Sequence, residues 1–249
     1  MFEAPNSRLG DRIVGIFGKK FNVLLVHEST YGGHILKQAL ESPLVSVYLA
    51  HSRADVLTAL RGLRRVWHCS VLDLHLPGGA SDHLLSGSTE LAHTVGIMSD
   101  GRPERVAQVT RLGLLDVHND SLRSIPHLAQ NVCRIAPLGL LLRGRRTAHQ
   151  HVFAHLLDHV VDTPQRWAYE THCSLRTLQA ACSECTRFPA FYVLRIYYAL
   201  RSLLCSVNPC LQTDGYGGWP TGRRSDRALV EECMEFVGGH LDRITRIGL

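Results

Sequence analysis

Short apolar runs alternate with helix-like segments along the first half of the chain. The apolar runs are rich in β-branched residues and predict five buried strands: Phe21–Val26, Leu44–Leu49, Cys69–Leu72, Thr94–Met98 and Leu114–Val117. The segments after these strands predict helices, because their apolar residues recur every three or four positions: Gly33–Ser42, Arg53–Leu63, His83–Ser86, Pro103–Leu112 and Leu122–Ile135. This alternation predicts an α/β domain, in which a parallel sheet has helices on both faces.

The second half of the chain has helical periodicity alone. Its predicted helices are Thr147–Val161, Gln165–Thr171, Leu175–Glu184, a longer helix that carries Arg195 and Arg201, and Arg227–Leu241. Ser174 is placed to cap the helix that starts at Leu175, and Leu178 and Cys182 would face the core. A helix, a tight turn and a second short helix are the layout of a helix-turn-helix, whose second helix enters the major groove of DNA.

These patterns divide the chain into four segments. We predict an N-terminal extension over residues 1–20, the α/β domain over 21–138, a linker helix over 139–162, and a helix-turn-helix domain with a C-terminal helix over 163–249. The stretch Gly139–Arg146 is predicted to be the crossover between the two domains.

Composition and charge indicate a globular protein with a basic segment. The chain has 249 residues, of which 45% are hydrophobic and 20% are charged. The longest apolar runs considered, Phe21–Val26 and Ala136–Leu142, are too short to cross a bilayer, and the first residues lack the order of a signal peptide. We therefore expect a cytoplasmic protein without a membrane partner. Residues 143–201 hold eight Arg against four Asp and Glu, a net +4 out of +5 for the whole chain.

Polar residues follow the predicted strands, where the carboxyl ends of parallel strands meet. They are His27 and Glu28, Asp73 with the sequence LHLPGG after it, Ser99 and Asp100, and His118, Asn119 and Asp120. This pattern resembles the receiver domain of the response-regulator family over about residues 22–135. Its most specific part is D-L-H-L-P-G at Asp73–Gly78. The resemblance implies a five-stranded parallel, flavodoxin-like receiver sheet.

The same resemblance assigns roles to three residues. Asp73 would be the phosphoacceptor, and a sensor histidine kinase would supply the phosphoryl group. Ser99 would be the switch hydroxyl that senses the phosphoryl group. Glu28 and Asp73 would hold Mg²⁺.

Two departures from the family weaken this chemistry. His27 stands where the family has a second acid, and imidazole is a poor substitute for the hard oxygen ligands of Mg²⁺. Asn119 or Asp120 stands where the family has a lysine, so the cation that would stabilise the phosphoryl oxygens is missing. Either Asp73 accepts phosphate with weakened Mg²⁺ affinity, or the domain is a pseudo-receiver that serves dimerisation or ligand sensing. A third interpretation is an unrelated flavodoxin-like domain with a chance motif.

The C-terminal half resembles one helix-turn-helix of the AraC/XylS family. The matching residues are W-A at 167–168, S-L-R-T-L-Q at 174–179 and F-P-A-F-Y-V-L-R-I-Y-Y-A-L-R-S-L-L at 188–204. The resemblance implies double-stranded DNA as the partner and assigns contacts with it to Arg176, Thr177, Gln179, Ala180 and Arg195. The family carries two such units and one is found here, so specific binding would need a homodimer. The alternative is a helical bundle that contacts another protein.

Two further groups of residues, one of histidines and one of cysteines, indicate a function less specifically. His151, His155 and His159 stand four apart on one helical face, which could bind zinc or sense pH but more often is a solvated or interface face. Cys182 and Cys185 form a CxxC pair without a second pair, so they and the other cysteines are interpreted as buried reduced thiols.

The sequence thus favours a DNA-binding transcription regulator of the response-regulator type, which is not an enzyme. Its receiver would control dimerisation. The alternatives are a signalling adaptor that acts through protein contacts without DNA, and a small α/β enzyme that uses Asp73 with a nearby histidine.

Overall fold

The computed structural model describes residues 20–62, 66–77, 80–87, 91, 93–98, 106–108, 110, 114–142 and 147–211. Three predictions lie outside these residues: the extension before residue 20, the switch residue Ser99 and the C-terminal helix Arg227–Leu241. Most of the helix predicted over Pro103–Leu112 also lies outside them.

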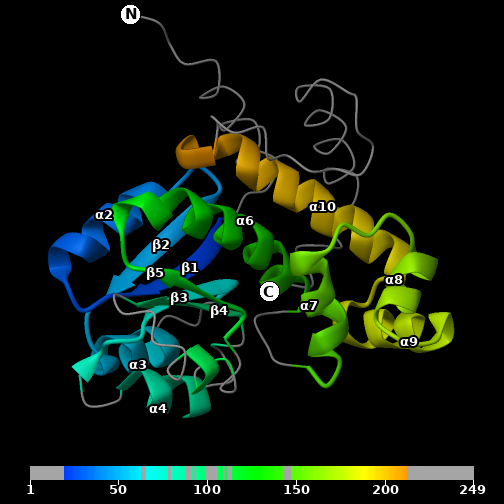
Figure 1. Cartoon of the computed structure of the whole chain (residues 1–249), viewed down its shortest axis with the longest axis horizontal. Helices are drawn as coiled ribbons and strands as arrows, with labels where there is room; N and C mark the ends of the chain where they lie inside the picture. Colours follow the sequence, from blue (N-terminus) through cyan, green and yellow to red (C-terminus); the bar gives the residue numbers. More distant parts are fainter. Residues whose placement is uncertain are drawn as a thin grey trace, which may run out of the picture.

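A five-stranded parallel sheet forms the centre of the first half (Figure 1). Its strands are β1 (Phe21–Val26), β2 (Val45–Ala50), β3 (Cys69–Asp73), β4 (Thr94–Met98) and β5 (Asp116–Asn119). They lie in the order β2-β1-β3-β4-β5, and every neighbouring pair is parallel. This is the flavodoxin-like order, so the predicted five-stranded parallel α/β fold is confirmed. β5 begins and ends two residues later than the predicted Leu114–Val117, although Leu115 N already donates to Thr94 O of β4 over 2.9 Å.

Helices cover both faces of the sheet. They are α2 (Thr30–Leu40) and α6 (Ile125–Leu141) on one face, and α3 (Arg53–Gly62) and α4 (Ala80–Gly87) on the other (Figure 1). Alternate residues of β1 point to opposite faces, so Val23 and Leu25 join the core under α2 and α6, while Leu24 and Val26 join the core under α3 and α4. A strand buried on both sides has this continuous apolar sequence.

The second half is helical, as predicted. Its helices are α7 (Gln150–Asp158), α8 (Pro164–Glu170), α9 (Leu175–Thr186) and α10 (Ala190–Val207), with a 3₁₀ turn η4 (Pro209–Leu211) after them and another, η3 (Leu122–Ser124), before α6. The side chain of Thr163 caps α8 by accepting from Arg166 N, and Ser174 caps α9 by accepting from Thr177 N. The capping role predicted for Ser174 is confirmed.

Helix α6 is longer than predicted. Gly139 was expected to begin a crossover, but residues 139–141 belong to α6, which continues past Pro137 because its residues there are buried. A Cβ atom added at Gly139 would lie 1.7 Å from the carbonyl oxygen of His68, so α6 packs backbone against backbone at the start of β3. The absence of a side chain at Gly139 makes this close approach possible.

Helix α10 joins the two halves into one core. It packs along α6, and a single apolar cluster extends from Val23 and Leu25 of β1 to Leu203 and Leu204 of α10. By length and composition alone α10 could cross a membrane, since its mean hydropathy is 1.2 over 18 residues. However, 72% of this helix is buried inside the protein, as is typical of a core helix.

Candidate functional site

Asp73 lies at the carboxyl end of the sheet, where the receiver resemblance places the phosphoacceptor. It is 6% exposed, and both of its carboxylate oxygens accept hydrogen bonds from the main chain. Glu28 N donates to Oδ2 over 3.0 Å, and His75 N donates to Oδ1 over 2.8 Å. These bonds fix the orientation of the carboxylate.

The ring of His27 occupies the space beside Asp73. Its Nδ1 accepts a hydrogen bond from Ser29 N over 3.0 Å and lies 3.9 Å from Asp73 Oδ2. Its Nε2 faces Asp120 Oδ2 at 3.4 Å. A Cβ atom at Gly32 would lie 2.7 Å from Cε1 of this ring, so the glycine makes room for the imidazole at the start of α2. His27 is thus held between two acids.

These residues do not fit a Mg²⁺ ion. Mg²⁺ requires near-octahedral oxygen ligands, whereas the Asp73 oxygens are already hydrogen-bonded and an imidazole separates Asp73 from Asp120. The side chain of Glu28 is exposed, and only its main-chain N contacts Asp73. Among the described residues, no group of three His, Cys, Asp or Glu side chains could hold a metal ion. The predicted Mg²⁺ site of Glu28 and Asp73 therefore has no support in this geometry.

The helix-turn-helix is anchored by Trp167 on α8. Its ring packs edge-on against Phe153 of α7, with ring centroids 5.8 Å apart, and its Nε1 donates to Val152 O over 2.9 Å. Leu178 and Cys182 of α9 are buried, as predicted. The turn between α8 and α9 includes His172, whose φ of 53° lies in the left-handed region. These contacts fix α9 against the rest of the domain and leave its opposite side exposed.

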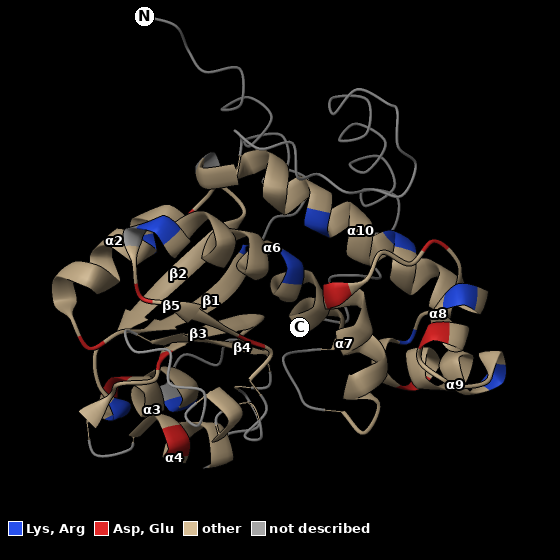
Figure 2. Cartoon of the chain, viewed as in Figure 1, with Lys and Arg blue, Asp and Glu red and all other residues tan. Residues whose placement is uncertain are grey.

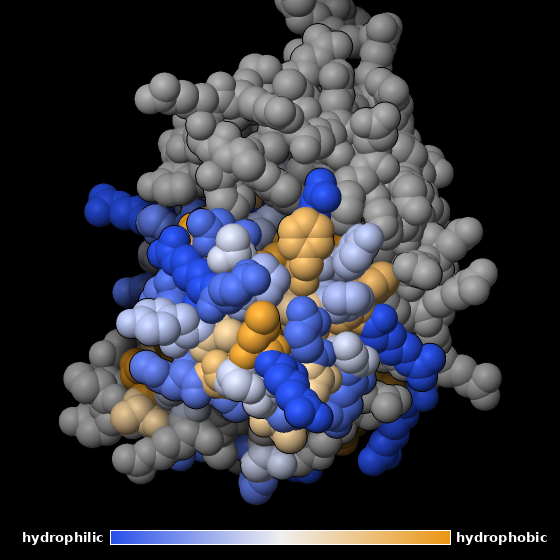
Figure 3. Space-filling view, turned by 90° about the vertical axis from the view of Figure 1, so that its right-hand side faces the viewer, coloured by the Kyte–Doolittle hydropathy of each residue, from blue (hydrophilic) through white to orange (hydrophobic). Residues whose placement is uncertain are grey.

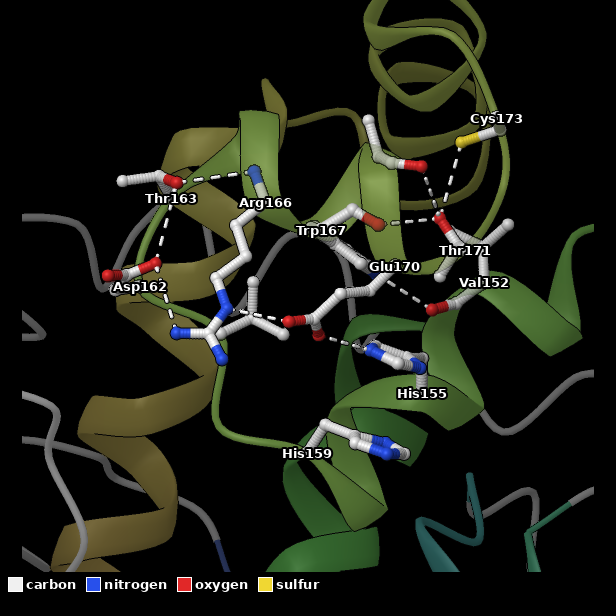
Figure 4. A network of polar contacts seen from close by, with 12 residues as sticks. Val152, His155, His159, Asp162, Thr163, Arg166, Trp167, Glu170, Thr171 and Cys173 are labelled. Atoms are coloured by element: carbon white, nitrogen blue, oxygen red, sulfur yellow. Dashed lines mark hydrogen bonds and ion pairs between the residues drawn. The ribbon is translucent and has the colours of Figure 1, made fainter.

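A chain of polar contacts ties α7 to α8 (Figure 4). Glu170 accepts from Arg166 Nε over 2.6 Å through Oε1, and its Oε2 lies 2.7 Å from His155 Nε2. The hydrogen bond from His155, followed by that from Arg166, lowers the pKa of the Glu170 carboxyl below its usual range. His159 stacks on His155 with ring centroids 4.1 Å apart. The three histidines therefore differ in their surroundings, because His155 is paired with an acid and His151 is exposed.

The predicted DNA-contacting residues of α9 divide into two sets. Arg176, Thr177 and Ala180 are exposed on the outer side of the helix, as predicted. Gln179 is half-buried, and its Oε1 accepts a hydrogen bond from Ala190 N over 3.1 Å. This bond caps the start of α10, so the oxygen of Gln179 is engaged within the protein.

The fifth predicted residue, Arg195 of α10, is half-buried. Its guanidinium carbon lies 5.6 Å from the ring centroid of Phe191, a distance that permits a cation–π contact. Phe191 and Leu175 are 48% and 40% exposed. Phe191 and the cationic Arg187, which is also exposed, were not predicted as parts of this surface. Arg187 could have been noticed as a basic residue directly after the predicted recognition helix, where it ends α9 with a φ of 62°.

The acidic residues near α9 are paired, whereas two exposed arginines are not. Glu170 is paired with Arg166 and His155, and Glu184 lies 3.8 Å from His149. Within the described part of the chain, Arg176 and Arg187 have no carboxylate within salt-bridge distance. Figure 2 shows basic residues on α8, α9 and α10, and Figure 3 shows the end of the molecule that carries these helices as mostly hydrophilic around a few apolar side chains. This surface could bind phosphate groups.

Comparisons with known proteins give distant structural matches. No protein-family model and no curated protein matches the sequence. The solved structure of full-length FixJ from B. japonicum has a TM-score of 0.35 at 18% identity, and the match covers 74% of this chain and 97% of FixJ. The RcsB response regulator of Salmonella typhimurium has a TM-score of 0.38 at 14% identity, over 71% of this chain and 92% of RcsB.

A third match is RcsB from Salmonella enterica serovar Typhimurium bound to promoter rprA in the presence of the phosphomimetic BeF3⁻. Its TM-score is 0.37 at 14% identity, over 70% of this chain and 97% of that one. Similarity at this level does not assign a function, so the fold assignment rests on the strand order given above.

Proposed function

We propose that this protein is a DNA-binding transcription regulator of the response-regulator type, whose receiver-like domain works without Mg²⁺. The observation that carries the proposal is the outer side of α9. Arg176, Thr177 and Ala180 are exposed there, while the opposite side of the helix is buried against the domain. Arg can pair with guanine, Thr can bond to either base edge, and a small apolar group can meet the thymine methyl.

The electrostatics of this surface favour the same partner. The acids beside α9 are paired with His and Arg, whereas Arg176 and Arg187 are exposed and could contact phosphates. One helix-turn-helix contacts a short half-site, so we propose that a homodimer presents two copies of α9 to two half-sites. AraC-type recognition remains part of this proposal.

The receiver-like domain would act as a pseudo-receiver. Both oxygens of Asp73 are bonded to the main chain, and His27 fills the space beside it. No Lys or Arg side chain of the described residues lies within ion-pair distance of Asp73, so the charge on a transferred phosphoryl group would lack a stabilising cation. We propose that this domain sets the geometry of the dimer without phosphorylation by a kinase.

DNA binding can be tested with fluorescence anisotropy on labelled random and genomic fragments at several salt concentrations. We expect affinity to fall as salt rises, and Arg176→Ala to weaken binding roughly tenfold to a hundredfold if the arginine contacts a base. Arg53→Ala, an exposed arginine at the start of α3, is the matched control and should bind like the wild type. The proposal fails if neither DNA pool binds at low salt, or if both variants bind equally well.

A protein–protein adaptor is the second candidate function. Leu175 and Phe191 are exposed near the outer side of α9, and apolar side chains of this kind can contact another protein. The adaptor function would be favoured if Phe191→Ser abolished a protein complex while DNA affinity was absent at every salt concentration.

A further inference from the structure

Two imidazole rings, one from α2 and one from the end of β2, lie next to each other at the carboxyl end of the sheet. His34 is in the second turn of α2, and His51 directly follows β2. Their ring centroids are 6.3 Å apart, and the planes of the rings differ by 21°. His34 is exposed and His51 is half-buried, so solvent can reach both rings. The two positions form no local motif, and the pair was not predicted from the sequence.

Backbone carbonyl groups orient both rings in the same way. His34 Nδ1 lies 2.8 Å from Thr30 O on the same helix, and His51 Nδ1 lies 2.9 Å from His27 O at the end of β1. A carbonyl oxygen only accepts, so in each neutral ring Nδ1 carries the hydrogen and Nε2 keeps a free lone pair. Neither Nε2 has a hydrogen-bond partner among the described residues. Histidines that bind a metal ion are typically held by such a bond from their other ring nitrogen.

The separation of the rings suits one ion between them. A Zn–N bond of about 2.0–2.1 Å places the centres of two rings on the same ion roughly 5–6 Å apart. The observed 6.3 Å is slightly longer. His51 is fixed to the end of β1, whereas exposed His34 is bonded only within its own helix, so a small rotation of His34 can bring the two nitrogen atoms onto one ion.

An acidic side chain next to His51 favours a cation at this place. His51 N donates to Asp55 Oδ2 over 3.1 Å, and Ser52 Oγ donates to the same oxygen over 2.9 Å. These bonds hold the Asp55 carboxylate close to His51. An ionised carboxylate near two neutral imidazoles attracts a positively charged ligand more strongly than the imidazoles alone would.

We propose that His34 and His51 form a binding site for a divalent transition-metal ion such as Zn²⁺, which both Nε2 atoms coordinate and water completes. Imidazole is a good ligand for Zn²⁺, Cu²⁺ and Ni²⁺, whereas Mg²⁺ prefers oxygen. This site therefore differs in chemistry from the Mg²⁺ site that was predicted at Glu28 and Asp73.

The other stacked histidine pair in the described part of the chain is less suited to an ion. The rings of His155 and His159 lie face to face, with centroids 4.1 Å apart and planes that differ by 5°. His155 Nε2 is also 2.7 Å from Glu170 Oε2 and is thus engaged within the protein. This comparison favours His34 and His51 over the histidines that share one face of α7.

An ion at this site would connect α2 to the end of β2. The carbonyl oxygen that holds His51 belongs to His27, whose ring lies beside Asp73. Binding to the folded chain alone would raise its resistance to urea. The site is independent of the DNA proposal, because it requires only the two imidazoles and an ion.

The site can be tested by titrating the full-length protein, first freed of metal with a chelator, with ZnCl₂ in a calorimeter at neutral pH. We expect the wild type to bind Zn²⁺, and His34→Ala and His51→Ala each to bind it roughly tenfold more weakly or less. His151→Ala removes an exposed histidine one turn before His155 and is the matched control, which should bind like the wild type. MgCl₂ should give no binding at this site in any of these proteins.

Circular dichroism of each variant checks that it folds. If His51→Ala does not fold, His34→Ala decides, because the ring of His34 is bonded only to Thr30 O of its own helix. The proposal is overturned if the wild type binds no Zn²⁺, or if a folded His34→Ala or His51→Ala variant keeps the wild-type affinity. It is also overturned if His151→Ala weakens binding as much as these two changes do.

Discussion

A histidine lies beside a carboxylate both at the carboxyl end of the sheet and next to α9, but the two arrangements favour ligands of opposite charge. At the sheet, His27 lies between Asp73 and Asp120 and fills the space that a cation would need. Next to α9, His155 and Arg166 engage Glu170 and leave nearby arginines exposed to solvent. The first region is closed to a positively charged ligand, while the second is open to a negatively charged one.

Both regions are built on one hydrophobic core, so a substitution that disturbs this core should have the largest effect on the free energy of unfolding. Gly139→Ala places a Cβ atom 1.7 Å from His68 O, and backbone atoms must move to relieve the clash. We expect destabilisation of about 3 kcal/mol or more, measured by urea denaturation. Gly33→Ala is the control, because its Cβ would meet mainly the flexible tip of Leu49 at 2.9 Å. Equal stability of the two variants would contradict the close packing of α6 on β3.

The sheet region can be opened to a cation by His27→Asp. This change removes the imidazole and adds a carboxylate beside Asp73 and Asp120, which restores the oxygen ligands that Mg²⁺ prefers. We expect isothermal titration calorimetry to detect Mg²⁺ binding by the variant and none by the wild type. His34→Asp makes the same charge change at an exposed position on α2 and should not bind. Equal Mg²⁺ affinity in wild type and variant would show that His27 does not close the pocket.

These two sites show what could and could not be predicted from the sequence. The strands were found because residues buried on both faces leave continuous apolar runs, as in β1 and β4, whose bounds were predicted correctly. The departure at His27 was visible, but the placement of its ring between two acids depends on Asp120 at the end of a distant strand. Contacts between distant residues leave no periodic signal.

The errors at α6 and Gln179 have related causes. The helix was predicted to end at Ile135, with a crossover from Gly139, whereas burial against β3 and α10 keeps α6 intact to Leu141. Gln179 was assigned to the outer side of α9 by periodicity, but Ala190 N at the start of the next helix attracts its side chain. Tertiary contacts override local pattern in both cases.

The contact between α7 and α8 should depend on pH through Glu170. The pKa of this carboxyl lies below its usual range, so its contribution to stability is present at neutral pH and is lost as pH falls through the lowered pKa. We expect Glu170→Gln to lower the urea midpoint at pH 7, and this difference to shrink on acidification below pH 4.5. Glu184→Gln, which loses a longer 3.8 Å contact with His149, should have a smaller effect at pH 7. A difference between wild type and Glu170→Gln that is independent of pH would contradict the role of this carboxylate.

The smallest expected effect is that of Gln179→Ala, which tests whether this residue of α9 caps α10 or contacts DNA. Gln179→Ala removes the hydrogen bond to Ala190 N at the start of α10, where Pro189 supplies no side-chain cap, so we expect a loss of about 1 kcal/mol in unfolding free energy. The DNA affinity of this variant should change less than that of Arg176→Ala, because the exposed Arg176 can reach a base edge while the oxygen of Gln179 is engaged inside the protein. Urea denaturation and fluorescence anisotropy on the same samples measure both quantities. The opposite result would be a Gln179→Ala variant with unchanged stability and a loss of DNA affinity as large as that of Arg176→Ala. In that case Gln179 would belong to the DNA-contacting side of α9 rather than to the side that packs against the domain.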